Sequence, residues 1–466
     1  MYLLAVITYL GLLVVGSIWG SRKIRTGDDF LVAGRSLPAH VLVFTLLSTW
    51  IGSGSLFGGA GLGYRVGFPA LWQSAGAWVG ITLIYWIAPR VRNIAQYTVP
   101  DILELRYGPA ARVLGTVTTV IAYSTIAAYQ FRGGGRLLEL LAGVDPKTGA
   151  LITAIFCVIY TSLAGMLSIA YLDVVNGSIM TIGVVLATGF LVADAGGLSV
   201  ALTQLRPDQV SLFGSLSPQT ALALFFPTMF LLLGEANMYQ KFFSAKDARA
   251  AKMAVVGWIA GTLIVETLID SIGVFGSQVI PGLGTEASEA IVISVAMQAL
   301  PTVVGIVLVC GASAIIVSTA NSFLLTPATN LMRDVYQRFI NPDVSGTQVL
   351  LYTRLMVVAL GVIGYVAGNF FPTILAMALW AYTMYGASIT PALLAAFVWP
   401  RATRLGGVAS IGIGIVTTLV WEIIGMARAV DGVATYPFGF QTIYPALTLS
   451  IFTLISVSLV TRRVDS

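Results

Sequence analysis

Glycine and hydroxyl residues interrupt an apolar stretch near the start of the chain, in the run from Ser48 to Ser55, which is STWIGSGS. A helix that is broken inside a bilayer leaves backbone carbonyls without partners, which is tolerated only where protein or a water-filled cavity satisfies them. Carbonyl and hydroxyl oxygens suit a hard monovalent cation. Discontinuous helices near the middle of the membrane are the usual marker of a transporter's binding site. The run therefore predicts a cation site.

A pair of hydroxyl residues far along the chain supplies further ligands of the same kind. Ser318 and Thr319 follow a largely apolar run from Val303 to Val317. In membrane helices such hydroxyls often bond to the carbonyl one turn back, which is the structural alternative. Taken together with the break, the pair favours a cation that bridges two helices.

A carboxylate, Glu235, lies within another apolar stretch, at residues 218–243. A carboxylate at membrane depth costs about 2.5–3.5 kcal/mol on insertion scales, so it requires a partner or water. A cationic solute is one such partner. Lys241, which we expect nearer the membrane surface, is the other.

Two further pairs of charged residues have the i, i+4 spacing that places both members on one helix face. Arg132 and Arg136 form the basic pair, and Glu266 and Asp270 form the acidic pair. We expect the two pairs to meet, directly or through water, in an outer vestibule. A role as charged residues of an outer gate is the alternative.

The elements that position these residues are thirteen apolar stretches of helical length. The chain is 57% hydrophobic and only 10% charged, with a mean hydropathy of +0.90. Runs of about twenty apolar residues span a bilayer. The predicted helices are 2–20, 39–65, 68–89, 113–142, 149–166, 172–193, 218–243, 251–279, 302–338, 349–370, 373–399, 405–427 and 440–461. We therefore predict an all-α integral membrane protein with one transporter domain over residues 1–466.

Basic residues alternate between the two sides of this arrangement. One set of loops carries Arg22, Lys23, Arg25, Arg35, Arg90, Arg92, Arg106, Arg112, Lys241, Lys246, Arg249, Lys252, Arg333, Arg338, Arg354, Arg401, Arg404, Arg462 and Arg463. The other set carries only Arg65, Lys147, Arg206 and Arg428. Because short cytoplasmic loops are rich in Lys and Arg, the N-terminus is predicted outside and the C-terminus inside the plasma membrane. The positive charge lies between helices, so it does not indicate a nucleic-acid partner.

The sequence does not favour an enzyme. The chain contains one histidine, His40, and two cysteines, Cys157 and Cys310, each within an apolar stretch. It has no H-E-x-x-H or G-x-S-x-G motif, and its glycine-rich run at 58–63 lacks the strand–turn–helix context of a dinucleotide site. No organic cofactor is expected. A channel would need a continuous polar pore, and a sensor would carry an appended signalling domain, so both are less favoured.

Several segments, in order along nearly the whole chain, resemble the sodium:solute symporter family. They are residues 28–37 (DDFLVAGRSL), 98–108 (TVPDILELRYG), 170–175 (AYLDVV), 240–246 (QKFFSAK), 317–322 (VSTANS), 333–336 (RDVY) and 380–400. Within the family, residues 49–52 and the seventh predicted helix resemble the choline-transporter branch.

The resemblance implies a LeuT-type fold with two five-helix repeats of inverted topology. Repeat 1 would cover residues 39–193, the second to sixth helices, and repeat 2 would cover 218–399, the seventh to eleventh. The helices at 2–20, 405–427 and 440–461 would be peripheral. The second helix would be discontinuous.

The resemblance also implies a sodium site and a second cation position. The sodium ligands would be the carbonyls of Ser48, Ile51 and Ile315 and the hydroxyls of Ser318 and Thr319. Some members of the family use a second sodium site, which would map to Asp173, Asn321 and Ser322. The alternative for Asp173 is a helix N-terminal cap, because an aspartate there accepts backbone N–H groups.

In this fold the solute lies beside the broken helix. The predicted solute residues are Trp50, Gly52, Ser53, Ser55, Phe57, Trp72, Gln73, Tyr123, Glu235, Asn237 and Trp380. Interfacial packing is the alternative, most of all for Trp72 and Tyr123. Only Trp50 matches the aromatic cage of the choline branch and Glu235 replaces another aromatic, so a small organic amine or amino acid is predicted instead of choline.

These residues predict a symporter that imports a small organic solute with Na+ as coupling ion, by alternating access. A sodium-independent or proton-coupled carrier of the same fold is the alternative.

Overall fold

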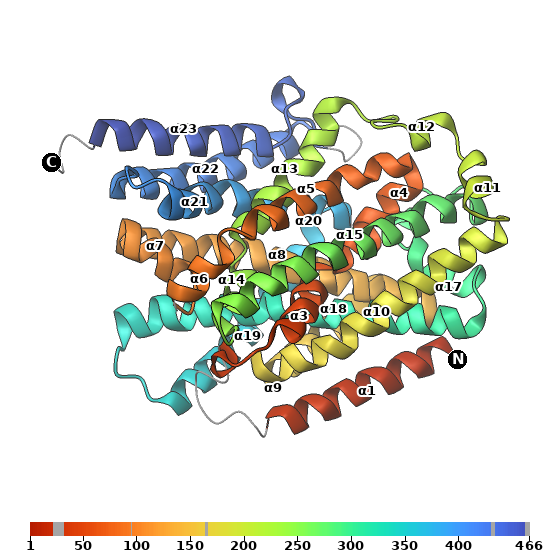
Figure 1. Cartoon of the computed structure of the whole chain (residues 1–466), viewed down its shortest axis with the longest axis horizontal. Coiled ribbons are helices and arrows are strands. Elements are labelled where there is room, and N and C mark those ends of the chain that lie inside the picture. The colour runs from red at the N-terminus through yellow and green to blue at the C-terminus, as the bar shows by residue number, and fades with distance from the viewer. Residues whose placement is uncertain (22–31, 95, 164–165, 430–433, 462–466) are drawn as a thin grey trace.

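The computed structural model describes residues 1–21, 32–94, 96–163, 166–429 and 434–461 (Figure 1). Arg22, Lys23, Arg25, Arg462 and Arg463, together with the motif residues 28–31, lie outside the described residues. The described part of the chain is helical, and its sole β feature is an isolated bridge between Leu37 and Ala245.

The first half of the chain forms helices, of which the long ones run roughly along the long axis of the molecule (Figure 1). They are α1 (Tyr2–Ser21), α3 (Ala39–Trp50), the π-helical turn η2 (Gly54–Gly59), α4 (Ala60–Val66), α5 (Leu71–Ile84), α6 (Ala88–Ile94), α7 (Val99–Tyr107), α8 (Pro109–Ala142), α9 (Pro146–Leu163), α10 (Met166–Asp194), α11 (Leu198–Thr203) and α12 (Pro207–Val210). Gly108 separates α7 from α8 with φ +89°, a conformation that glycine adopts readily, and Pro109 opens α8.

The second half repeats this pattern of long helices with short connections. Its elements are α13 (Pro218–Gly234), α14 (Ala236–Ser244), α15 (Ala248–Val279), α16 (Thr285–Ser288), α17 (Ile291–Gln298), α18 (Thr302–Asn330), the π-helical segment η4 (Leu331–Ile340), α19 (Gly346–Ala367), α20 (Ile374–Ser388), α21 (Thr390–Val398), α22 (Arg404–Ala427) and α23 (Ile443–Thr461).

The described residues contain 11 helices long and apolar enough to cross a membrane, and a bent pair, α3 with η2–α4, makes up to 12. The prediction of an all-α membrane protein is confirmed. The predicted helix 68–89 divides into α5, which has 14 residues, and α6, so the count of thirteen stays a prediction. The start of α1 and the end of α23 lie at opposite ends of the molecule (Figure 1).

Helices differ strongly in how much of their apolar surface the protein covers. In the span formed by α18 and η4, 83% of the most apolar window is buried, compared with 17% for α1. On α1, Leu4 and Leu12 are 69% and 65% exposed, so their side chains face the lipid. The span of α18 and η4 is therefore central and α1 is peripheral.

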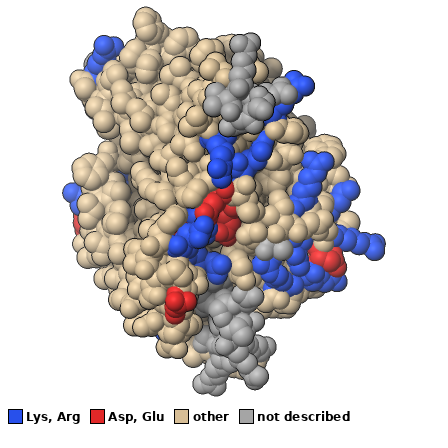
Figure 2. All heavy atoms as spheres, turned by 90° about the vertical axis from the view of Figure 1, so that its left-hand side faces the viewer, with Lys and Arg blue, Asp and Glu red and all other residues tan. Residues whose placement is uncertain are grey.

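Charged side chains gather at the end of the molecule that carries α7 and the C-terminus. Figure 2 shows this end, where Lys and Arg side chains surround a few Asp and Glu side chains. Residues of other kinds form the rest of this face. Basic side chains are expected at the ends of membrane-spanning helices, outside the hydrocarbon.

Candidate cation and solute site

The first helix break lies between α3 and η2. Ile51 is extended, with φ −74° and ψ 114°, and the two helical pieces meet at a bend of 53°. The Thr319 hydroxyl of α18 donates to the carbonyl oxygens of Ser48 at 3.2 Å and Ile51 at 3.1 Å. A side chain more than 260 residues away in the chain thus satisfies carbonyls that the break leaves free.

Glycine at position 52 permits this close approach. A Cβ atom at Gly52 would lie 2.7 Å from Gln130 Nε2 and 3.0 Å from Thr319 Cγ2, both too short for an ordinary contact. The carbonyl of the same Gln130 side chain, on α8, accepts the backbone N–H of Ser53 at 2.8 Å. The break is therefore held between α8 and α18.

Asp173 lies beside this break, with 1% of its surface exposed. Its two carboxylate oxygens accept the hydroxyls of Ser318 and Thr45, each at 2.5 Å, and its backbone carbonyl accepts the Ser48 hydroxyl at 3.0 Å. The helix α10 begins at Met166, well before Asp173, so the predicted start of a helix at 172 and the capping alternative for Asp173 are wrong.

The remaining predicted cation ligands lie on α18 close to Thr319. Ile315 is buried one turn earlier, and the Ser322 hydroxyl lies 3.0 Å from the Thr49 hydroxyl. Both polar atoms of the buried Asn321 amide lack a hydrogen-bond partner. The oxygen types fit a hard cation, whereas the described residues contain no cluster of three His, Cys, Asp or Glu side chains for a transition metal.

A second helix break, which the sequence did not reveal, occurs at Glu235 between α13 and α14. Glu235 is extended, with ψ 118°. The hydroxyl of Tyr385 donates to the carbonyl of Gly234 at 2.8 Å, and that of Tyr239 donates to the carbonyl of Leu233 at 2.9 Å. Gly234 is the one sequence signal for this break, because glycine is a weak helix former.

The Glu235 carboxylate is fully buried at this second break. Its Oε1 accepts the Asn237 amide at 3.3 Å, and its Oε2 has no partner. Lys241 is buried inside the protein, with 1% of its surface exposed, and among the described residues it forms no ion pair with Glu235 within 4.0 Å. The pairing of Glu235 with Lys241 is therefore wrong.

Part of the predicted solute set converges on the first break. Trp50 donates its indole N–H to Glu266 Oε1 at 2.8 Å, and Ser55 donates its hydroxyl to the same oxygen at 3.4 Å. The rings of Trp50 and Tyr382 are 5.9 Å apart. Ser53 and Phe57 are buried against α8. Sequence reasoning did not include Glu266 or Tyr382 in this set.

Other members of the set lie at or near the second break. Tyr123 stacks on Tyr385 at 5.3 Å, and the amide of Asn237 accepts the Thr326 hydroxyl. Gln73 is buried on α5, with its amide oxygen unpartnered, and no hydrogen bond joins it to either break among the described residues. Tyr123 of α8 and Asn237 of α14 therefore lie at the second break.

Two predicted solute residues lie elsewhere. Trp72 stacks on Phe213 at 5.4 Å and donates to the carbonyl of Leu212, so its contacts are those of packing. Trp380 packs against Phe371 and lines a separate cavity of about 220 Å³ with residues of α13 and α22. Tyr382, two positions later on α20, faces the break instead, because residues two apart on a helix point in different directions.

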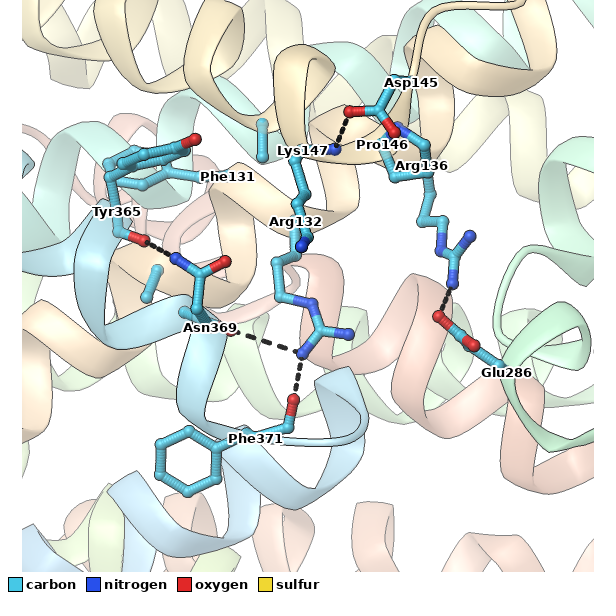
Figure 3. Close-up of a pocket in the computed structure, with 13 residues that line it drawn as sticks. Phe131, Arg132, Arg136, Asp145, Pro146, Lys147, Glu286, Tyr365, Asn369 and Phe371 are labelled. Carbon is cyan, nitrogen blue, oxygen red and sulfur yellow. Dashed lines mark hydrogen bonds and ion pairs between the residues drawn. The ribbon is translucent and has the colours of Figure 1, made fainter. Parts of the chain in front are cut away.

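The predicted match between the two charged pairs is wrong. Arg132 donates to the carbonyls of Phe371 at 2.7 Å and Pro372 at 3.1 Å, and Arg136 pairs with Glu286. Both arginines line a cavity of about 340 Å³. Figure 3 shows Arg132 pointing toward Phe371 and Arg136 toward Glu286. The acidic pair faces inward, since Glu266 contacts Trp50 and Asp270 accepts the Ser74 hydroxyl at 3.1 Å.

A carboxylate fastens the segment α16–α17 to the start of α20. Glu289 accepts the backbone N–H groups of Ile374 and Leu375, both at 3.1 Å. Burial raises the pKa of the Glu289 carboxyl, although these two N–H groups act in the opposite direction. The contact joins this segment to α20, the helix that carries Tyr382 and Tyr385.

A network around Arg112 joins α7, α8 and η4. Arg112 pairs with Asp101 of α7 at 2.5 Å, Asp334 of η4 at 2.6 Å, and Glu104. Arg338 adds a second contact to Glu104 at 3.0 Å. Burial tends to raise the pKa of Glu104, but the hydrogen bonds from the two arginines outweigh it, so the pKa lies below its ordinary value.

Known proteins resemble this chain over nearly its whole length. The osmoregulated proline transporter OpuE of Bacillus subtilis (strain 168) is 26% identical over 98% of this chain and 94% of its own. The sodium/pantothenate symporter of Escherichia coli (strain K12) is 28% identical over 96% of this chain and 94% of its own.

Solved structures share the fold. A Na+-coupled sialic acid symporter in a substrate-bound outward-open state matches with a TM-score of 0.79 and 16% identity, covering 98% of this chain and 97% of that one. Mhp1, a nucleobase-cation-symport-1 family transporter in a closed conformation, matches with a TM-score of 0.63 and 11% identity, covering 93% and 95%. A sequence profile of the sodium:solute symporter family matches residues 30–414, and the chain therefore belongs to that family.

Proposed function

We propose that this protein imports a small organic solute, an amine or amino acid, together with sodium across the plasma membrane. The observation that carries the proposal is the contact of the Thr319 hydroxyl with the carbonyls of Ser48 and Ile51 across the broken helix. Three oxygens from two helices already converge there. A sodium ion can bind among them as the Thr319 hydroxyl turns its hydrogen away and keeps its proton, because sodium accepts neutral oxygen ligands.

The proposed sodium ligands are the carbonyls of Ser48, Ile51 and Ile315 and the hydroxyls of Ser318 and Thr319. The Ser318 hydroxyl donates its proton to Asp173, which leaves its oxygen lone pairs available to a cation. The carboxylate of Asp173 thereby adds negative charge next to the site without being a direct ligand. The bound ion would join α3 to α18.

The proposed solute position lies between the two helix breaks. The unpartnered Oε2 of Glu235 is fully buried, and a cationic group on the solute would satisfy it. Trp50 and Tyr382 offer aromatic faces to such a cation. Relatives named for proline support an amino acid, whereas the likeness to the choline branch stays a prediction from the sequence.

Coupling follows from the position of the ion. Sodium that bridges α3 and α18 favours the outward-open state, which then binds solute better. The gain is reciprocal, so solute raises the affinity for sodium by the same factor. The membrane potential adds about 2.3 kcal/mol per charge per 100 mV to the inward movement of the ion.

The two helix breaks also support the proposed internal repeats. The broken pair α3 and α4 would open repeat 1 (39–193), and α13 with α14 would open repeat 2 (218–399). The concentration of basic side chains at the C-terminal end of the molecule supports a cytoplasmic C-terminus and an external N-terminus (Figure 2).

The test replaces both hydroxyls of α18, in the variant Ser318→Ala/Thr319→Ala. We expect its sodium affinity to fall at least tenfold, or about 1.4 kcal/mol. Sodium titrations of the thermal unfolding of purified protein would measure the affinity. Thr353→Ala on α19 is the control, because that buried hydroxyl bonds only to Val349 one turn back.

Uptake of L-proline, pantothenate, amines and amino acids into proteoliposomes completes the test. We expect uptake of one of these solutes to require a sodium gradient. Equal sodium affinity in wild type and the double variant would contradict the proposed site. Uptake driven by a pH gradient in the absence of sodium would favour the proton-coupled alternative.

A further inference from the structure

Lys241 of α14 is a fully buried lysine, with 1% of its surface exposed. A buried ammonium group requires hydrogen-bond partners and compensating charge. Its Nζ donates to the carbonyl of Thr45 at 2.8 Å and to the hydroxyl of Thr49. Among the described residues, no carboxylate oxygen lies within 4.0 Å of this nitrogen. Neutral oxygens alone therefore form its direct surroundings.

These neutral oxygens are the kind of ligand that a sodium ion takes, a backbone carbonyl and a hydroxyl from neighbouring turns of α3. The hydroxyl of each threonine also forms a hydrogen bond with a residue of the predicted second sodium site. The Thr45 hydroxyl donates to Asp173 at 2.5 Å, and the Thr49 hydroxyl lies 3.0 Å from that of Ser322. The ammonium group is thus one residue removed from both Asp173 and Ser322.

We propose that the ammonium group of Lys241 is a built-in cation that takes the place of a second sodium ion beside Asp173. The protein would accordingly bind one sodium ion, at the Thr319 site. This inference rests on the proposed sodium-coupled function and specifies its ion stoichiometry.

The charges near the two breaks are consistent with this assignment. Asp173 and Glu235 are the carboxylates that attract the Lys241 ammonium. The fixed positive charge offsets the negative charge of Asp173, so a second sodium ion in the same place would meet a like charge instead of a free carboxylate. Lys241 also fastens α14, which follows the Glu235 break, to α3, which carries the sodium carbonyls.

The test counts the sodium ions that bind to the purified full-length protein, with sodium alone as the probe. Equilibrium binding of radioactive sodium measures the number, and sodium titrations of thermal unfolding at constant ionic strength measure the cooperativity. Wild type is expected to bind one ion. Lys241→Met removes the charge at similar length and is expected to bind two, with the Hill coefficient rising from about 1 toward 2.

Lys246→Met is the matched control, because the Lys246 side chain is exposed a few residues later. It is expected to bind one ion, as wild type does. Two ions bound to wild type, or one ion bound to folded Lys241→Met with unchanged affinity, would overturn the proposal.

Asp173→Asn keeps the proposal testable if Lys241→Met does not fold. With Lys241 present, Asp173→Asn is expected to leave the number of ions at one, and a fall from two to one would overturn the inference. Failure of the proposed function looks different, since neither wild type nor any variant would then bind sodium.

Discussion

At the scale of single residues, the chemistry of this site depends on backbone oxygens and the side chains that reach them. Thr319 reaches the carbonyls of the first break, and Tyr385 and Tyr239 reach those of the second. Backbone groups freed inside a membrane must be satisfied in this way. In the proposed function, the oxygens at the first break would bind the cation as neutral ligands, with the Thr319 hydroxyl keeping its proton.

Gly52 offers a direct test of how closely α18 must approach the break. We expect Gly52→Ala to reduce sodium affinity at least tenfold, because the added methyl group would lie 3.0 Å from Thr319 Cγ2 and 2.7 Å from Gln130 Nε2. Sodium titration of thermal unfolding measures the effect. Gly412→Ala on α22 is the control, since nothing lies within 4 Å of its added atom. A similar loss of sodium affinity in both variants would contradict a specific role of Gly52 in the approach of α18.

At the scale of elements, two broken helices face a set of continuous ones. The first break is visible in the sequence because several glycines and serines occur together. The second occupies a single residue, Glu235, between two helices that the sequence shows as one apolar run. Its position becomes clear only when Tyr385 and Tyr239 are seen to satisfy the freed carbonyls.

The ion-pair network of Arg112 tests how α7, α8 and η4 are held together. Arg112→Gln leaves Asp101 and Asp334 buried without their cation, and breaking such pairs costs about 3–5 kcal/mol. We therefore expect a clearly lower temperature of thermal unfolding. Arg354→Gln on α19, where the side chain is exposed, should change it little. Equal unfolding temperatures for the two variants would show that the network contributes no stability.

At the scale of the whole molecule, the residues at the two helix breaks are enclosed by protein. Trp50 is 7% exposed and Glu235 is fully buried, between the Glu289 contact at one end and the Arg112 network at the other. In the proposed function, solute would reach Glu235 only after one of these contacts opens. Alternating access requires two such contacts that open in turn, one on each side of the membrane.

The orientation of the molecule can be tested with single introduced cysteines. Gly284→Cys and Gly346→Cys both lie in open space, and the native Cys157 and Cys310 are buried. In intact cells, a membrane-impermeant maleimide is expected to label Gly284→Cys and to leave Gly346→Cys unlabelled until the cells are permeabilised. The reverse pattern would place the N-terminus inside.

The sequence by itself determined the fold class, the family and the first break, because these depend on local composition and on short motifs. Apolar runs are set by the bilayer thickness, and a glycine-rich interruption is a local property. The sequence also indicated Ser48, Ile51 and Thr319, which the structure brings together. The partners of the charged side chains could not be predicted in this way, because they depend on how the helices are rotated against one another.

Only the tertiary structure decided which charges meet. Lys241 turns inward to Thr45 instead of pairing with Glu235, and Arg132 turns to backbone carbonyls instead of Glu266. Each of these side chains is long enough to reach several different partners, and the contacts join residues from distant parts of the chain. Because an unpartnered charge inside the membrane is costly, the packing of the helices determines which partner each charge contacts.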